Sequence, residues 1–328
     1  MRTSQPLVRA PRDMTCPMLE IAEGCTYNRC RFCGIYRKHP FKLYPMDRVI
    51  RNIDEIARKA TLMTRRIYLA GGNPFGIPTE HLVEVFDAVE ERIPQVNSYG
   101  GFCRILDVKG KSDSELALLA ERGVNDLDIG AESGLDSTLE FIEKGHTAQD
   151  VVEQGLRLHD AGMDFTYFYL AGLAGAGRCV ENAIASAEAF SKAAPTTILV
   201  VCLAPVKTWP LAEDIQSGRW TAPTEVEMAQ EVRAFVEYLD CKTTVNCSHD
   251  SDVIRFEGGL PADRQKMLAL LDDRIPKIDE RYARMMREMI HGGTLGKAAT
   301  AERRRSSSRS ASYLVLRASI EKCKQESR

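Results

Sequence analysis

The sequence predicts an α/β protein, a partial (β/α)6 TIM-like barrel with a C-terminal helical extension. Short apolar runs alternate with longer segments of helical periodicity, which is the pattern of βα units and a parallel sheet. The chain has 328 residues and 44% hydrophobic content, enough to bury one large core. Beyond about residue 205 the alternation weakens, so an extension is expected after the barrel.

Six apolar runs are expected to form the barrel strands. Each run is short and is flanked by turn-forming or polar residues, as are strands that are buried on both faces of a sheet. The runs are residues 18–22, 67–70, 98–106, 126–131, 165–171 and 198–203.

Amphipathic segments separate these runs and predict the outer helices. Residues 47–59, 80–93 and 114–122 carry apolar side chains at a period near 3.6. Polar residues stand where N-caps are needed, and glycines stand where helices would stop. The expected N-caps are Thr79, Ser112 and Thr147, and the expected stops are Gly123 and Gly162.

The same pattern predicts the domain organisation. A polar leader (1–14) precedes the barrel core (15–205), an α/β extension (206–290) closes the barrel, and a basic, serine-rich tail (291–328) is mostly disordered. Within the extension and tail we expect helices over 223–240 and 261–289, a seventh short strand over 243–247 and a weak helical pattern over 312–324.

Charge and hydropathy limit the classes of partner. The 44 basic and 46 acidic residues nearly cancel, so no global field attracts nucleic acid, and only Arg303, Arg304, Arg305 and Arg309 form a local basic run. The sequence shows neither a signal-peptide pattern nor the ~20 consecutive apolar residues of a membrane span. We therefore expect a cytoplasmic protein with no membrane partner, and nucleic acid is a disfavoured partner.

Three of the ten cysteines, Cys25, Cys30 and Cys33, lie within nine residues directly after the first predicted strand. In an α/β barrel the loop at a strand's carboxyl end belongs to the face that carries active sites. Three thiolates can hold three corners of a [4Fe–4S] cluster and leave one iron open to another ligand. Two other interpretations stay open: a zinc site completed by His39, and ordinary buried thiols.

With Phe32 directly before the last cysteine, this loop resembles the cluster motif of the radical SAM superfamily. The usual spacing is CX3CX2C, whereas this chain has CX4CX2C, a departure shared with uncharacterised relatives of the HemN/Elp3/MiaB-like branch. The resemblance implies a [4Fe–4S] cluster and S-adenosylmethionine (SAM) as cofactors.

Further motifs at predicted strand ends are similar to SAM-binding elements of that superfamily. The Gly71-Gly72-Asn73 turn resembles the GGEP motif that receives the amino group of SAM, with Asn73 in place of the acid. Glu132-Ser133 and Lys144 resemble the ES … KGHT pattern, and the turn at Gly172 resembles GLPGE without its proline and glutamate. Residues 207–211 resemble a P-G-T-P-L stretch, with Trp209 inserted. The implied cofactor contacts are Phe32, Gly71, Gly72, Asn73, Glu132, Ser133, Lys144 and Gly172.

Membership implies reductive cleavage of SAM to a 5′-deoxyadenosyl radical, which abstracts hydrogen from a small-molecule or peptide substrate. An electron donor of the flavodoxin or ferredoxin type is implied as a partner. Two alternatives use the same fold: a non-catalytic iron–sulfur protein that carries electrons or senses redox state, and a zinc-stabilised barrel that binds a ligand without chemistry.

The sequence leaves several residues without a fixed role, including the catalytic ones toward substrate. Arg104 is a candidate clamp for a carboxylate or phosphate, and Tyr167 and Tyr169 either line the barrel or belong to its core. Cys16, Cys241 and Cys247 are spaced too loosely to favour a second cluster.

Overall fold

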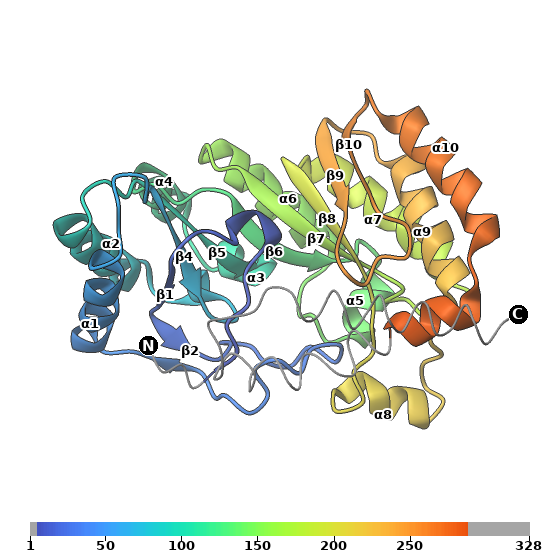
Figure 1. Ribbon diagram of the computed structural model, residues 1–328, viewed down its shortest axis with the longest axis horizontal. Helices are drawn as coiled ribbons and strands as arrows, with labels where there is room; N and C mark the ends of the chain where they lie inside the picture. The colour runs from blue at the N-terminus through green and yellow to red at the C-terminus, as the bar shows by residue number, and fades with distance from the viewer. Residues whose placement is uncertain (1–4, 288–328) are drawn as a thin grey trace, which may run out of the picture. The chain divides into compact units, whose positions relative to one another are not determined.

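The computed structural model describes residues 5–287, whose main element is an open sheet of eight strands. Neighbouring strands are parallel except for the last pair, and β1 and β10 are the two edges (Figure 1). The partial α/β barrel is thereby confirmed. In spatial order the strands are β1 (Met18–Glu20), β4 (Arg66–Ala70), β5 (Ser98–Arg104), β6 (Leu127–Glu132), β7 (Phe165–Ala171), β8 (Thr197–Cys202), β9 (Thr243–Cys247) and β10 (Phe256–Leu260).

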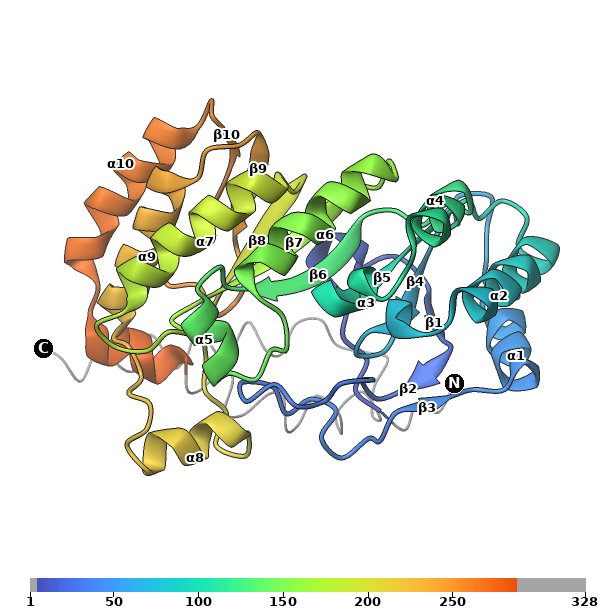
Figure 2. The same ribbon diagram turned by 180° about the vertical axis from the view of Figure 1, so that it is seen from behind.

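Helices cover the outer face of this sheet and form the main core with it. Figure 2 shows α6, α7 and α9 in front of the strands. Residues 280–287 are helical as well. The helices are α1 (Met46–Ala57), α2 (Thr79–Arg92), α3 (Ile105–Lys109), α4 (Asp113–Glu121), α5 (Asp136–Phe141), α6 (Ala148–Asp160), α7 (Cys179–Ala193), α8 (Pro210–Gln216), α9 (Glu225–Tyr238) and α10 (Arg264–Arg274), with 3-10 turns η1 (Pro11–Asp13), η2 (Pro74–Gly76) and η3 (Ile275–Lys277).

Most helix-end predictions are confirmed. Ser112 and Thr147 each cap a helix in a reciprocal capping box with an acidic residue three positions later. Gly123 and Gly162 follow helix ends with φ angles of 85° and 74°. Thr79 as an N-cap is wrong, because α2 begins at this residue after Pro78 and its hydroxyl donates instead to Glu115.

Three strand predictions need correction. The first run breaks after Glu20, and Ala22–Glu23 forms a separate strand, β2, that pairs antiparallel with β3 (Lys42–Leu43). The third run ends at Arg104, and helix α3 begins at Ile105. The Asp107 side chain, in the first turn of α3, accepts from the Arg104 backbone N–H. Strand β10 was not predicted, because its two glycines give it low strand propensity. It forms a strand through its antiparallel pairing with β9.

The seventh strand expected over 243–247 is confirmed as β9, which adds to the same sheet as β8. The tail predicted to be mostly disordered (291–328), the helical pattern expected over 312–324 and the arginine run lie outside the described residues. In the part of the chain that is described, the longest apolar helical stretches are too short or too charged to cross a membrane.

The leader lies against the amino ends of the strands. Arg12 of η1 donates to Thr166 and to the carboxylates of Asp126 and Asp128, and neighbouring Asp13 accepts from Arg66. Asp128 is fully buried, and this burial raises its pKa to about 7 even though Arg12 lowers it. The leader thus supplies the cation that makes a carboxylate tolerable inside the barrel.

We predict that Arg12→Met lowers the free energy of unfolding by roughly 2 kcal/mol, because Asp128 loses a guanidinium that is itself 33% exposed. A raised pKa in the folded state means that stability falls as pH rises from the unfolded pKa, about 4, through about 7. Without Arg12 the folded pKa rises further, so the deficit is expected to be larger at pH 8.5 than at pH 5.

Urea denaturation at the two pH values measures this. The double variant Arg12→Met, Asp128→Asn is the control, since it removes the carboxylate and is expected to show the same deficit at both. An Arg12→Met deficit independent of pH would contradict the role given to this ion pair.

Candidate functional site

The three clustered cysteines lie in the loop between β2 and β3, at the carboxyl ends of the strands. In Figure 1 this blue loop lies below the strands, on the side opposite η1. Cys25, Cys30 and Cys33 are each partly exposed and free of disulfides. The sequence prediction that they share one loop on the strand-end face agrees with their position.

The first part of the loop is fastened to the turn after β4. The Gly72 N–H donates to the Gly24 carbonyl at 3.0 Å, and the Asn73 carbonyl oxygen Oδ1 accepts from the Thr26 N–H at 2.9 Å. The Asn73 amide donates to Thr26 Oγ1 at 2.6 Å and to both oxygens of Asp107. The buried Asn73 side chain is therefore engaged in holding the loop.

Glycine is needed at position 72 for a steric reason. A Cβ placed there would lie 2.5 Å from the Cβ of Cys25 and 3.0 Å from its Cα. Gly71 has a φ of 134°, a backbone conformation that residues with a side chain rarely adopt. The glycine pair thus lets the turn pass directly under the first cysteine.

The second part of the loop is fastened to α8 and to the segment before Lys144. Arg31 binds both carboxylate oxygens of Asp214, at 2.7 and 2.9 Å, and its carbonyl accepts from Leu211 N–H. The Arg31 N–H donates to Ile142, and the Trp209 indole packs against Gly34. A bidentate pair of this kind fixes orientation as well as distance.

Glu132 and Lys144 form a buried ion pair beside this loop. Lys144 Nζ lies 2.7 Å from Glu132 Oε1 and 5.5 Å from the centre of the Phe32 ring. Burial lowers the pKa of Lys144, but the Glu132 and Cys30 charges outweigh it, and the net pKa lies above the usual value. Glu132 has a φ of 68° at a bulge in the β6–β7 pairing, so backbone strain aims its side chain.

Arg104 and Tyr27 complete the polar wall of the site. The Arg104 guanidinium stacks 3.8 Å above the Tyr27 ring and donates to the Lys144 carbonyl. Tyr27 in turn donates to the carbonyl of Glu143 at 2.7 Å. The buried Nε of Arg104 has no hydrogen-bond acceptor among residues 5–287, so this group retains a free donor.

Two sequence-predicted contacts lie away from this group. Ser133 is fully buried and donates to Asn182 of α7, and the Gly172 N–H donates to Glu231 of α9. Tyr167 and Tyr169 face the helices: the Tyr167 hydroxyl donates to Val151, and the Tyr169 ring stacks on Phe235. Both tyrosines are therefore core residues and do not line the barrel interior.

The donor set fits an iron–sulfur cluster. Burial raises the pKa of Cys30, and it raises that of Cys33 to about 12, so metal binding there would displace protons. Among the described residues no group of three or more His, Cys, Asp and Glu side chains is arranged around a single metal ion. In a [4Fe–4S] cluster each thiolate binds a different iron, which requires wider spacing than one ion.

The remaining cysteines named above have separate surroundings. Cys16 donates to Asp13, whereas Cys241 and Cys247 contact the carbonyls of Phe190 and Ile254. The three thiols lie in different parts of the fold. Nothing in their contacts favours a second cluster.

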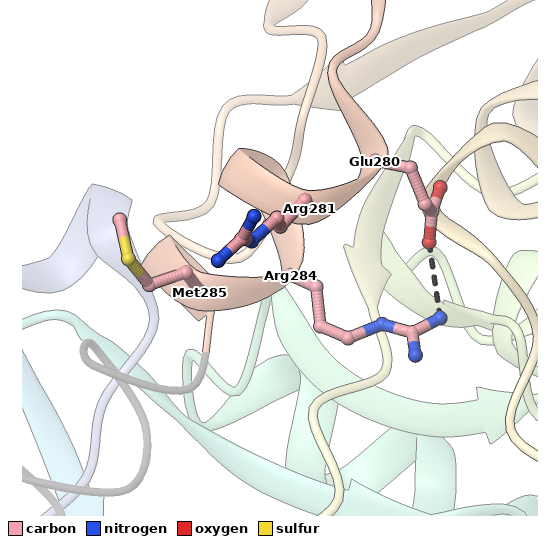
Figure 3. Close-up of a pocket in the computed structure, with 4 residues that line it drawn as sticks. All are labelled: Glu280, Arg281, Arg284 and Met285. Atoms are coloured by element: carbon pink, nitrogen blue, oxygen red, sulfur yellow. Dashed lines mark hydrogen bonds and ion pairs between the residues drawn. The ribbon is translucent and has the colours of Figure 1, made fainter. Parts of the chain in front are cut away.

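A separate hollow lies on the C-terminal helical segment. Figure 3 shows Glu280, Arg281, Arg284 and Met285 lining a cavity of about 430 Å³, with Arg284 paired to Glu280. None of these residues was predicted as a site residue. The cysteine loop contributes nothing to its described lining.

The sequence profile of the Radical SAM superfamily matches residues 19–175, from β1 to the turn after β7. Residues 19–175 therefore form a radical SAM domain. The matched stretch contains every residue predicted above to bind the cluster or SAM. Proteins of this superfamily use a [4Fe–4S] cluster and SAM, so the cofactors expected from the sequence are those of the family.

Individual relatives are distant. The heme chaperone HemW of Bacillus subtilis is 24% identical over 140 residues, which cover 41% of this chain and 37% of HemW. Coproporphyrinogen III oxidase (HemN) from Escherichia coli has the same fold, with a TM-score of 0.52 and 13% identity over 68% of this chain and 52% of HemN. The methyltransferase TsrM from Kitasatospora setae gives a TM-score of 0.49 at 16% identity, over 62% of this chain and 37% of TsrM. The resemblance to the superfamily and to its HemN/Elp3-like branch is confirmed.

Sequence reasoning missed several residues that build the site. Thr26, Tyr27 and Arg31 lie inside the cysteine loop, where nearness to the motif was the available signal. Asp107 lies 34 residues from its partner Asn73, and Asp214 lies 183 residues from its partner Arg31. No local sequence pattern predicts partners that lie so far apart along the chain.

We predict that Gly72→Ala reduces the iron bound per chain several-fold after anaerobic reconstitution, because the new methyl group displaces Cys25. The matched control is Gly110→Ala, where the nearest atom to a new Cβ is 3.3 Å away and iron content should match the wild type. Thermal unfolding separates the effects, since overpacking alone costs roughly 1–3 kcal/mol. Full iron content in Gly72→Ala would contradict the contact.

Proposed function

We propose that this protein is a radical SAM enzyme in which Cys25, Cys30 and Cys33 ligate a [4Fe–4S] cluster. The observation that carries the proposal is the joint position of the three thiols, the glycine turn under Cys25 and the Glu132–Lys144 pair on one strand-end face. An electron carrier needs the thiols but has no use for the rest. When bound, the reduced cluster supplies the electron that breaks the sulfur–C5′ bond of SAM and generates a 5′-deoxyadenosyl radical.

The chain's own residues bind and orient SAM in this proposal. The carbonyls of the Gly71–Gly72 turn accept from its amino group, and Lys144 is the cation available to its carboxylate. Glu132 accepts from a SAM hydroxyl or ammonium, with its strained backbone fixing the direction. Phe32 and Trp209 exclude water beside the cysteine loop.

The proposed substrate is a small molecule or a peptide. Arg104 is the group on the site wall with a spare donor, which suits a substrate that carries a carboxylate or phosphate.

The proposed electron donor is an acidic protein of the flavodoxin or ferredoxin type. Residues 24–46 contain five basic and no acidic side chains, and four of the basic ones are exposed.

Anaerobic reconstitution with iron and sulfide tests the proposal. We expect a brown protein that releases 5′-deoxyadenosine from SAM when dithionite is added, measured by chromatography. A cluster that forms without SAM cleavage would instead identify an electron carrier or redox sensor. A colourless protein that retains zinc would identify a zinc-stabilised barrel.

Serine variants assign the ligands. Cys30→Ser is expected to lose cluster absorbance and 5′-deoxyadenosine release to background. Cys241→Ser is the matched control, because this partly buried thiol contacts the Phe190 carbonyl and the hydrophobic core, away from the cysteine loop, and should retain both signals. Equal activity in the two variants would refute the ligand assignment.

A further inference from the structure

A carboxylate on α9 is buried behind the strand ends without a cationic partner. Glu231 is fully buried, and its hydrogen-bond partners in the described chain are all neutral. Tyr169 and Asn182 donate to its Oε1 at 2.7 and 2.8 Å, and the Gly172 N–H donates to its Oε2 at 2.7 Å. Burial raises the pKa of Glu231 to about 7, against the lowering effect of these donors. A group this costly to bury calls for a specific role.

One oxygen of Glu231 holds the turn after β7. Gly172 is the first residue of that turn and has a φ of 91°. Its N–H points to Glu231, and the opposite side packs on Met228 and Pro223, where a Cβ would meet Met228 Sδ at 2.7 Å. The position of the turn is therefore set by α9 and the segment before it.

The other oxygen reaches the turn after β6 through one intermediate. Asn182 donates to Glu231 and accepts from the Ser133 hydroxyl at 2.6 Å. The Ser133 oxygen accepts from the Leu135 N–H, and Ser133 directly follows the strained Glu132. The ionised Glu231 carboxylate can only accept, so the Asn182 amide donates to it and the Ser133 hydroxyl donates to the Asn182 carbonyl oxygen.

We propose that Glu231 is a positioning residue for SAM: it fixes the turns after β6 and β7 relative to one another and thereby holds Glu132 and Gly172 in register for the cofactor. The proposal rests on the proposed function, in which Glu132 contacts SAM, and on the expectation from the sequence that the turn at Gly172 lies against SAM as well. Glu231 itself touches neither cofactor nor substrate.

The variant Glu231→Gln removes one acceptor and adds a donor at nearly constant volume. Its single carbonyl oxygen cannot face both Asn182 and Gly172, so one of the two turns loses its partner. In the reconstituted full-length protein we expect the KM for SAM in 5′-deoxyadenosine release to rise about tenfold, a change equal to roughly 1.4 kcal/mol, with iron content unchanged.

A second substitution is expected to rescue the first. In Glu231→Gln, Asn182→Asp the glutamine amide donates to the new carboxylate, its carbonyl accepts from Gly172, and Ser133 still finds an acceptor. The KM for SAM should return to within about twofold of the wild type. Asn182→Asp alone places two carboxylates together and should raise the KM at least as much as Glu231→Gln.

Asp128→Asn is the matched control for burial. Asp128 is also fully buried, also has a pKa near 7 and also accepts from a tyrosine hydroxyl, but it lies at the amino ends of the strands. Its KM for SAM should equal that of the wild type whatever its melting temperature. An unchanged KM in Glu231→Gln, or a double variant that folds without rescue, would overturn the proposal.

If the Glu231 variants do not fold, Ser133→Ala tests the proposal instead. This variant removes only the Ser133 hydrogen bonds that link Asn182 to the turn after β6. A KM for SAM equal to that of the wild type in Ser133→Ala would refute the link to Glu132. A failure of the proposed function looks different: the wild-type protein itself would then release no 5′-deoxyadenosine, whereas a failure of the positioning role leaves wild type and variants equally active.

Discussion

The site depends on one geometric constraint: parallel strands that share a sheet end at the same edge. The loop after β2, the turns after β4, β6 and β7 and the Arg104 side chain at the end of β5 therefore meet, although they span some 150 residues of chain. Because this edge is built from turns, its precision cannot come from core packing alone. It comes from polar side chains that tie each turn to its neighbour.

These ties follow a common arrangement. Asn73 joins the cysteine loop to the β4 turn and to Asp107, Arg31 joins it to Asp214 of α8, and Glu231 joins the β6 and β7 turns from behind. Each tie uses a buried or half-buried group whose other hydrogen-bonding atoms are satisfied. Such groups lose free energy if a partner moves, so they hold a loop more strictly than apolar contacts do.

The two ends of the barrel are built differently. At the amino ends the leader places Arg12 and Asp13 against Arg66 and Asp128, an ion-pair network that has charges of both signs. At the carboxyl ends the charged side chains of the cysteine loop are all basic, and the Nε of Arg104 has no acceptor within residues 5–287. Paired charges of both signs are typical of a structural role, whereas an excess of basic side chains on one loop is the feature on which the proposed binding face rests.

The sequence by itself determined the sheet class, the order of β4 to β9, two helix N-caps and the motifs on the strand-end face, because periodicity and local motifs are encoded within short windows. Tertiary structure alone decided which groups face each other. Asp107, Asp214 and Glu231 give no local signal, since each acts on a partner dozens of residues away. Long-range packing likewise decided the burial of Tyr169, the break after Glu20 and the pairing of β10. Such packing joins residues that are far apart along the chain, so it cannot be predicted from a short stretch of sequence.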